Sequence, residues 1–261
     1  MSSNSKRGSS GTHALNKMLA RAGNNNNNKK NTALNTQFKQ FNDRILGETG
    51  WDSYEYGGDG REQVEFFKKW SNAYQLINSM SPGDREAFRE WAGGYFMDGT
   101  QYRGWDNMSA YERSLTKVYD NILDRATLNH GLVAHRYSTA ELVLGAGHKT
   151  ATLAELQAAE GSLVTSKGSM SFGAAATGLG IGDSSKQIEY ELKIPAGSKG
   201  AGMWIADDRI HGWGVRQREF MTNRDIVLRV GKTVFDQSRN KYIVEIYYEG
   251  RTAHDYGKKK K

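Results

Sequence analysis

The segment "QIEYELKIPAGSKGAGMWIADD" (Gln187–Asp208) contains two short runs of strand-forming residues on either side of a turn. In the first run an apolar or aromatic residue recurs at every second position from Ile188 to Ile194, the spacing of side chains that share one face of a β-strand. The following "PAGSKG" combines proline and glycine, which favour turns. The second run is "GAGMWIA", so the segment predicts a strand, a turn and another strand.

Segments of the same kind occur on both sides of this pair. They are short, rich in β-branched and aromatic residues, and separated by turn-forming residues: "LVAHRY" (132–137), "REFM" (218–221), "DIVLRV" (225–230) and "KYIVEIYYE" (241–249). The second half of the chain therefore predicts a sheet built from many short strands.

The first half predicts helices instead. Three segments carry this signal: "REQVEFFKKWSNAYQLINSM" (61–80), "SPGDREAFREWAGGYF" (81–96) and "SAYERSLTKVYDNILDRA" (109–126). The second begins with Ser81 as an N-cap and Pro82 in the first turn. The apolar period of the third allows either Val118 or Tyr119 at one buried position. Helices followed by strands predict an α+β fold with an antiparallel-rich sheet.

The net charge of +7 is concentrated at the two ends of the chain. Residues 1–30 carry +6 and residues 258–261 carry +4, which leaves −3 of the total for residues 31–257. The N-terminal part is also rich in Ser, Asn and Gly, a composition that cannot bury a core. We therefore expect a disordered tail at 1–35, a folded domain at 36–257 (helical lobe 36–130, β-rich core 131–257) and a basic tail at 258–261. The tails either contact nucleic acid or serve solubility.

Composition also disfavours several classes of protein. The chain has no cysteine, so it has no disulfide, thiolate nucleophile or cysteine-ligated zinc. No stretch approaches the roughly 18 consecutive apolar residues of a membrane span, and the N-terminus lacks the apolar region of a secretory signal. We expect no membrane association and a cytoplasmic location, which is the host cytoplasm if this is a phage or secreted effector protein.

Two common site patterns are not matched. The Gly-rich "GAAATGLGIGDSSK" has neither the third glycine of a dinucleotide fingerprint nor the Gly-Lys-Ser/Thr of a phosphate loop. His130 and His135 are five residues apart in a loop-to-strand region, so they do not form a pair on one helix face. We therefore expect no metal site.

Four features that could carry chemistry occur in a fixed order. Arg136 lies inside an apolar strand, where a charge is costly unless it has a partner, either an internal acid or a bound phosphate. Next come a serine-rich strand, "TSKGSMSFGAAA", and then the strand–turn–strand segment. The last is "GWGVRQREFM", in which Gln217 and Glu219 share one face of an extended chain.

Together these features, from about Leu132 to Tyr248, resemble the arginine–serine–glutamate class of mono-ADP-ribosyltransferases, which includes the binary actin toxins and the Rho-modifying clostridial exoenzymes. The earlier "FREWAGGYFMDG" resembles a helix of that class. The resemblance implies an α+β fold with an N-terminal helical lobe and a two-sheet NAD-binding core. The serine motif, Ser169-Met170-Ser171, has methionine where the class has threonine. Ser169 is taken as its first serine, and a register that begins at Ser171 is the alternative.

The resemblance also implies roles in handling NAD, the co-substrate. Arg136 would hold the diphosphate, and Ser169 would fix the arrangement of Glu219 and the nicotinamide ribose. Glu219 would accept a hydrogen bond from the ribose and stabilise the positive charge that develops there. Three further residues are expected to contribute to the NAD site: Ser171, Phe172 and Tyr95.

Recognition of the acceptor is expected from the loop before Glu219. Gln217 would orient the incoming nucleophile without carrying a charge, and Trp213 would meet the target. Members of the class with Gln at this position modify asparagine, glutamine, threonine or guanine, whereas those with Glu resemble arginine modifiers. The expected function is NAD-dependent transfer of ADP-ribose to a macromolecule, most favourably a non-arginine protein side chain, by a monomer. The alternatives are modification of guanine or RNA, and a non-enzymatic nucleic-acid or particle-binding protein on a decayed transferase fold.

Overall fold

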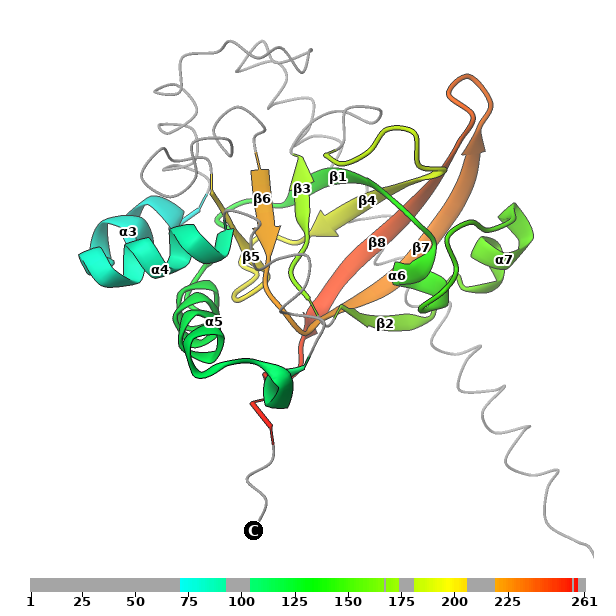
Figure 1. Ribbon diagram of the computed structural model, residues 1–261. Coiled ribbons are helices and arrows are strands. Elements are labelled where there is room, and N and C mark those ends of the chain that lie inside the picture. The colour runs from blue at the N-terminus through cyan, green and yellow to red at the C-terminus, as the bar shows by residue number, and fades with distance from the viewer. Residues whose placement is uncertain are drawn as a thin grey trace, which may run out of the picture.

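The computed structural model describes residues 71–92, 104–166, 168–173, 181–205, 219–254 and 256–257 (Figure 1). The expected tails at 1–35 and 258–261 and the first part of the helical lobe lie outside the described residues. The proposed domain boundaries therefore stay predictions.

The first described elements are helices, as expected. They are α3 (Ala73–Ser79), α4 (Pro82–Ala92), the short 3-10 helix η1 (Trp105–Asn107) and α5 (Ala110–Leu123). Helix α4 begins where its sequence predicted, because Ser81 Oγ accepts a hydrogen bond from the N–H of Asp84 at 3.0 Å and Pro82 takes the first position. Helix α5 has a capping box in which Ser109 and Glu112 each bond the other's backbone N–H.

The rest of the described chain is mainly strands. They are β1 (Leu132–Ser138), β2 (Leu163–Ser166), β3 (Ser171–Gly173), β4 (Ile188–Ile194), β5 (Gly202–Trp204), β6 (Glu219–Thr222), β7 (Ile226–Asp236) and β8 (Lys241–Arg251). Two short helices, α6 (Glu141–Leu144) and α7 (Leu153–Ala158), lie between β1 and β2. The α+β fold class is thus confirmed, with β4 and β5 as the strand pair of the segment 187–208.

All eight strands are connected by hydrogen bonds in the order β2-β7-β8-β4-β1-β3-β6-β5. Neighbouring strands are antiparallel except for β4 and β8, which are parallel. The seam between β1 and β3 is narrow, since its register contains the single pair His135–Gly173, whereas β1 and β4 are paired over seven positions. In place of the two expected sheets the structure has one continuous eight-stranded sheet, in which a group of five strands and a group of three meet at the short seam between β1 and β3.

The helices cover different parts of this sheet (Figure 1). Helices α3, α4 and α5 lie beside the group β3-β6-β5, and α6 and α7 lie at the other end, near β2 and β7. One hydrophobic cluster includes side chains from the helices and from both strand groups. Within it, Tyr119 of α5 stacks on Trp91 and Phe88 of α4, with ring centroids 3.6 and 5.3 Å apart.

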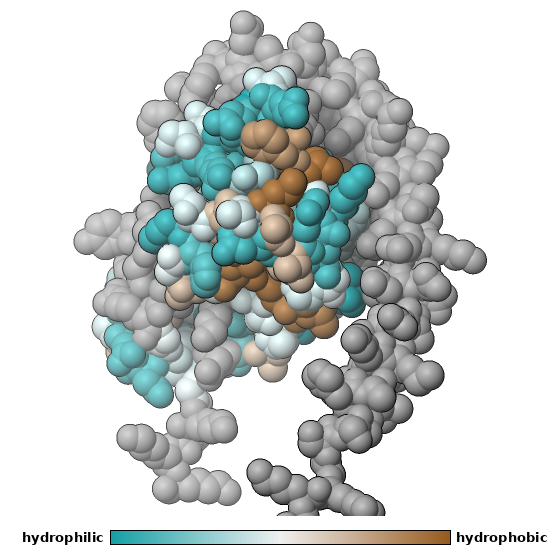
Figure 2. Space-filling model, turned by 90° about the vertical axis from the view of Figure 1, so that its right-hand side faces the viewer, coloured by the Kyte–Doolittle hydropathy of each residue, from teal (hydrophilic) through white to brown (hydrophobic). Residues whose placement is uncertain are grey.

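Figure 2 views the molecule from the end that carries α7, β2 and β7, and it shows hydrophobic side chains in a band bordered by hydrophilic ones. The large exposed hydrophobic residues of β2 and β7 are Leu163, Val234 and Phe235. Among the described residues, no helix has the length and apolar character needed to cross a lipid bilayer.

Candidate active site

Arg136 lies within β1, the strand that joins the two groups of the sheet. It pairs with Tyr190 of β4, and its Nη1 donates a hydrogen bond to the carbonyl oxygen of Ser171 in β3 at 2.9 Å. The side chain is only partly buried. The guanidinium is therefore held at the seam and directed toward β3, in a position where a planar cation can also bind an oxyanion.

Glu219 and Ser171 meet on the adjacent strands β6 and β3. Glu219 pairs with Gly173, and Ser171 pairs with Met221, so the two polar residues are diagonal neighbours on one face. The Ser171 hydroxyl donates to Glu219 Oε1, and both residues are buried, at 4% and 5% exposure. Gly173 has no side chain opposite Glu219, which gives the carboxylate room to lean toward Ser171.

Ser169 makes a different contact, although it lies only two residues earlier. Its Oγ is 2.8 Å from the hydroxyl of Tyr119, and the residue is 2% exposed. The same Tyr119 hydroxyl donates to the carbonyl oxygen of Thr222 at 2.9 Å. Of the two serines, the structure thus places Ser171 against Glu219 and Ser169 against helix α5.

The methionine between the serines is anchored through its backbone. The N–H of Met170 donates to Thr222 Oγ1, and the N–H of Thr222 donates to the carbonyl oxygen of Met170, both at 2.9 Å. The Met170 side chain packs against the hydrophobic core. These two hydrogen bonds join the start of β3 to the end of β6, and neither of them involves the side chain of Met170.

The remaining expected site residues are less closely tied to Glu219. Phe172 is fully buried in the hydrophobic core, opposite Phe220, so it lies on the other face of β3 from Ser171. Its described contacts are with the core, and its expected contribution to the NAD site stays a prediction. Tyr95, Trp213 and Gln217 lie outside the described residues, and their roles stay predictions.

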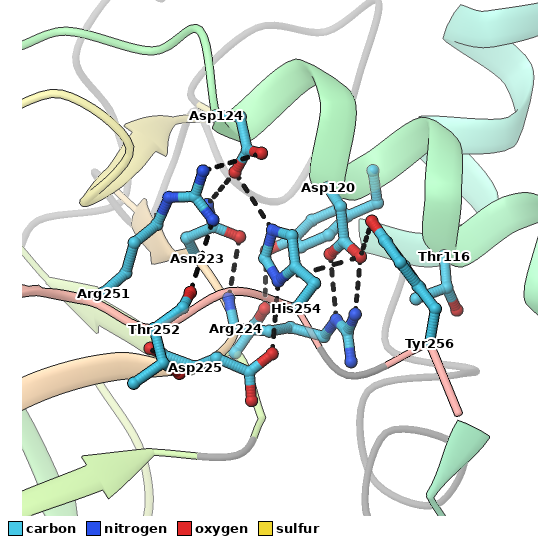
Figure 3. A network of polar contacts seen from close by, with 12 residues as sticks. Thr116, Asp120, Asp124, Asn223, Arg224, Asp225, Arg251, Thr252, His254 and Tyr256 are labelled. Carbon is cyan, nitrogen blue, oxygen red and sulfur yellow. Dashed lines mark hydrogen bonds and ion pairs between the residues drawn. The ribbon is translucent and has the colours of Figure 1, made fainter. Parts of the chain in front are cut away.

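Sequence reasoning missed a network of charged residues beside α5, shown in Figure 3. Asp120 of α5 accepts hydrogen bonds from Arg224 Nε at 2.9 Å and from Arg224 Nη2 at 2.5 Å. Both residues are buried, at 0% and 4% exposure. Tyr256 donates a further hydrogen bond to Asp120 at 2.9 Å. Because burial and the Asp120 charge disfavour the phenolate, the pKa of Tyr256 is raised.

His254 lies between carboxylates in the same network (Figure 3). Its Nδ1 is 3.2 Å from Asp225 and its Nε2 is 3.0 Å from Asp124, so both ring nitrogens act as donors when the imidazole is protonated. Burial alone would lower the pKa of His254, but the contacts with Asp225, Asp120 and Asp124 outweigh it and raise the pKa above its ordinary value. The network ties Thr252, His254 and Tyr256 to α5 and to the segment after β6.

No local pattern marks this network in the sequence. Asp120 and Arg224 are 104 positions apart, and Asp120 and Tyr256 are 136 apart. Within the described part of the chain, no group of three or more His, Asp or Glu side chains could hold a metal ion.

Three solved structures show what fold this arrangement represents. Plx2a, an ADP-ribosyltransferase toxin from Paenibacillus larvae, superposes with a TM-score of 0.56 and 13% identity over 74% of this chain and 98% of that one. C3stau2 from S. aureus, solved with NAD, gives 0.56 and 14% over 76% and 99%. The C3 exoenzyme of Clostridium limosum gives 0.57 and 14% over 76% and 98%. No protein-family model and no curated protein sequence matches the chain. The chain thus has the fold of these ADP-ribosyltransferases, and the identity is too low for the comparison to show more.

Proposed function

We propose that this protein is an NAD-dependent mono-ADP-ribosyltransferase that transfers ADP-ribose to a macromolecule. The observation that carries the proposal is the buried pair Ser171–Glu219, next to Arg136, on adjacent strands of an ADP-ribosyltransferase fold. A carboxylate, a hydroxyl and a guanidinium are together the groups that such a reaction needs. The register of the serine motif that begins at Ser171 fits this chemistry better than the one that begins at Ser169.

In this proposal Arg136 holds NAD through two-point hydrogen bonds to its diphosphate. Its existing bond to the Ser171 carbonyl keeps the guanidinium beside the strand that supports Glu219. A lysine could supply the charge at this position but not the planar pair of donors. NAD enters as a substrate, so no resident cofactor or metal is required.

Glu219 acts on the nicotinamide ribose. When the bond between the ribose carbon and the nicotinamide nitrogen breaks, its electron pair leaves with nicotinamide and positive charge develops on the ribose. A carboxylate held nearby stabilises that charge in the transition state. The hydroxyl of Ser171, bonded to Oε1, fixes the orientation of the carboxylate before the reaction begins.

We further propose that Gln217 orients the acceptor and that Trp213 contacts the target. This part rests on sequence alone, since an extended chain places residues 217 and 219 on one face. An uncharged amide suits a neutral acceptor, which favours a protein side chain other than arginine. The basic segments at 1–30 and 258–261 favour a second candidate, the modification of nucleic acid.

The test is incubation of the full chain with tagged NAD and host lysate, followed by separation of protein from nucleic acid. Label in the protein fraction is the expected result, and label in the nucleic-acid fraction supports the second candidate. Glu219→Gln is the matched control, because a glutamine oxygen can still accept the Ser171 hydroxyl bond. Failure of the wild-type chain to release nicotinamide or to transfer label under any condition refutes both.

A further inference from the structure

The Tyr119 hydroxyl contacts both chain segments that flank the proposed catalytic pair. Tyr119 is 0% exposed and extends from α5 to a point 2.8 Å from Ser169 Oγ and 2.9 Å from the carbonyl oxygen of Thr222. Ser169 is two residues before Ser171, and Thr222 is three residues after Glu219. The hydroxyl therefore joins the start of β3 to the end of β6.

The chemistry of the three groups fixes which one donates. A carbonyl oxygen only accepts, so the single Tyr119 proton goes to Thr222, and the Tyr119 oxygen is left to accept from the Ser169 hydroxyl. Burial raises the pKa of Tyr119 well above that of an ordinary tyrosine, and the phenol remains protonated. The donor is thus present throughout the physiological pH range.

The ring of Tyr119 is itself immobilised. It is stacked between α5 and α4, with Trp91 at a centroid distance of 3.6 Å and Phe88 at 5.3 Å. Between the same two segments, the N–H of Met170 donates to Thr222 Oγ1 and the N–H of Thr222 donates to the carbonyl oxygen of Met170, which joins the start of β3 to the end of β6. A rigid aromatic stack in the helical layer is in this way connected by hydrogen bonds to the strands that carry Ser171 and Glu219.

We propose that Tyr119 is a positioning residue that sets the alignment of Glu219 with Ser171 by fixing β3 against β6 from the helical layer. The inference rests on the proposed function of that pair in NAD cleavage. Tyr119 need not touch NAD, and it acts only through the two strands. Displacement of a catalytic group by about 1 Å can cost about 100-fold in rate.

The proposal predicts an effect on turnover rather than on NAD binding. The Glu219 carboxylate acts mainly in the transition state, so a small misalignment lowers kcat and leaves KM nearly unchanged. Tyr119→Phe removes only the hydroxyl and keeps the ring in its stack. We expect kcat for NAD hydrolysis to fall about tenfold, a smaller loss than the roughly 100-fold expected for a displacement of 1 Å. The KM for NAD should change by less than about twofold.

Tyr247→Phe is the matched control. Tyr247 is also buried, at 2% exposure, and its hydroxyl donates to Glu245 at 2.8 Å. It lies in β8, which is separated from β3 by β4 and β1. This variant also removes the hydroxyl of a buried tyrosine, but it does so in a strand away from the proposed site. Both kcat and KM should therefore stay near the wild-type values.

The kinetic constants of the three proteins are measured at equal concentrations of folded protein, and crystal structures of both variants give a second readout. The proposal requires a selective loss of kcat in Tyr119→Phe and a lengthened or disordered Ser171–Glu219 contact. A kcat equal to that of Tyr247→Phe, or a rise in KM alone, overturns it. If wild-type protein does not cleave NAD, the proposed function fails, and an undisturbed Ser171–Glu219 contact in the Tyr119→Phe crystal overturns the positioning role separately.

Discussion

Asp120→Asn tests how strongly the charge network of Figure 3 stabilises the fold. Asp120 is fully buried and accepts three hydrogen bonds, two from Arg224 and one from Tyr256. Asparagine keeps the shape of the side chain but has one acceptor oxygen and no charge. Its amide nitrogen would face donors of Arg224, which is only 4% exposed and cannot turn to water.

The expected magnitude follows from the burial of both partners. Removal of one partner of a buried ion pair typically destabilises a protein by about 3–5 kcal/mol, because the other charge remains desolvated. For a folded unit of 150–250 residues, each kcal/mol lowers Tm by about 2–4 °C. We therefore expect the lower free energy of unfolding to appear as a fall in Tm on the order of 10 °C, without a change in solubility.

Asp124→Asn serves as the control. Asp124 contacts Arg251, His254 and Asn223 in the same network, and asparagine keeps one oxygen that can accept from the buried side chains of His254 and Asn223. The charge is lost mainly from the pair with Arg251, in which both side chains are 30% exposed. A partly solvated pair of this kind contributes about 1 kcal/mol or less. Urea denaturation of wild type and both variants at pH 7 measures the differences. A loss for Asp120→Asn below about 1 kcal/mol, or no larger than that for Asp124→Asn, would refute the argument from burial.

The remaining predictions concern the proposed chemistry and the response to pH. Glu219→Gln should lower NAD hydrolysis about 100- to 1000-fold without loss of folding, and retention of more than about a tenth of wild-type turnover contradicts its assignment. Arg136→Lys should weaken NAD binding, and a large fall in Tm with unchanged NAD affinity would instead indicate a structural role. The pKa of His254 is raised on folding by Asp225, Asp120 and Asp124, so its stabilising effect is complete below its unfolded pKa of about 6.5 and is lost as pH rises through the folded value. The stability difference between wild type and His254→Gln should therefore shrink with rising pH, and a difference that grows instead would contradict the raised pKa.

Local sequence signals were sufficient to predict the fold class. Helix α4 begins at the expected cap, Ser81 and Pro82, and β4 coincides with the alternating run that ends at Ile194. These features depend on neighbours within a few positions, which is the range over which caps and side-chain periodicity act. The narrow seam between β1 and β3 depends instead on strands that meet only in the folded chain, and its register could not be predicted.

The hydrogen-bonding partners of the candidate site residues were harder to predict for the same reason. The order of motifs identified Arg136, the serine strand and Glu219 as candidates, but it left two registers for the serines open. The pairing of β3 with β6 brings Ser171 rather than Ser169 to Glu219, which supports the proposed register that begins at Ser171. Strand pairing across 48 positions has no signature in a single sequence.

The buried face of helix α5 is wider than the apolar period of its sequence predicts. The apolar pattern predicts Leu115, either Val118 or Tyr119, and Ile122 on the core face. The structure buries Tyr119, and the buried arc also includes Thr116 and Asp120. A helix whose buried face exceeds its apolar face must meet polar partners there, because an unpartnered buried carboxylate is too costly. In this molecule the adjacent residues 119 and 120 meet different partners, the strands of the proposed catalytic pair and the Arg224 network respectively. Since both act through one rigid turn of helix, loss of the Asp120 ion pair should also disturb the contacts of Tyr119, and their combined effect on stability should not be additive.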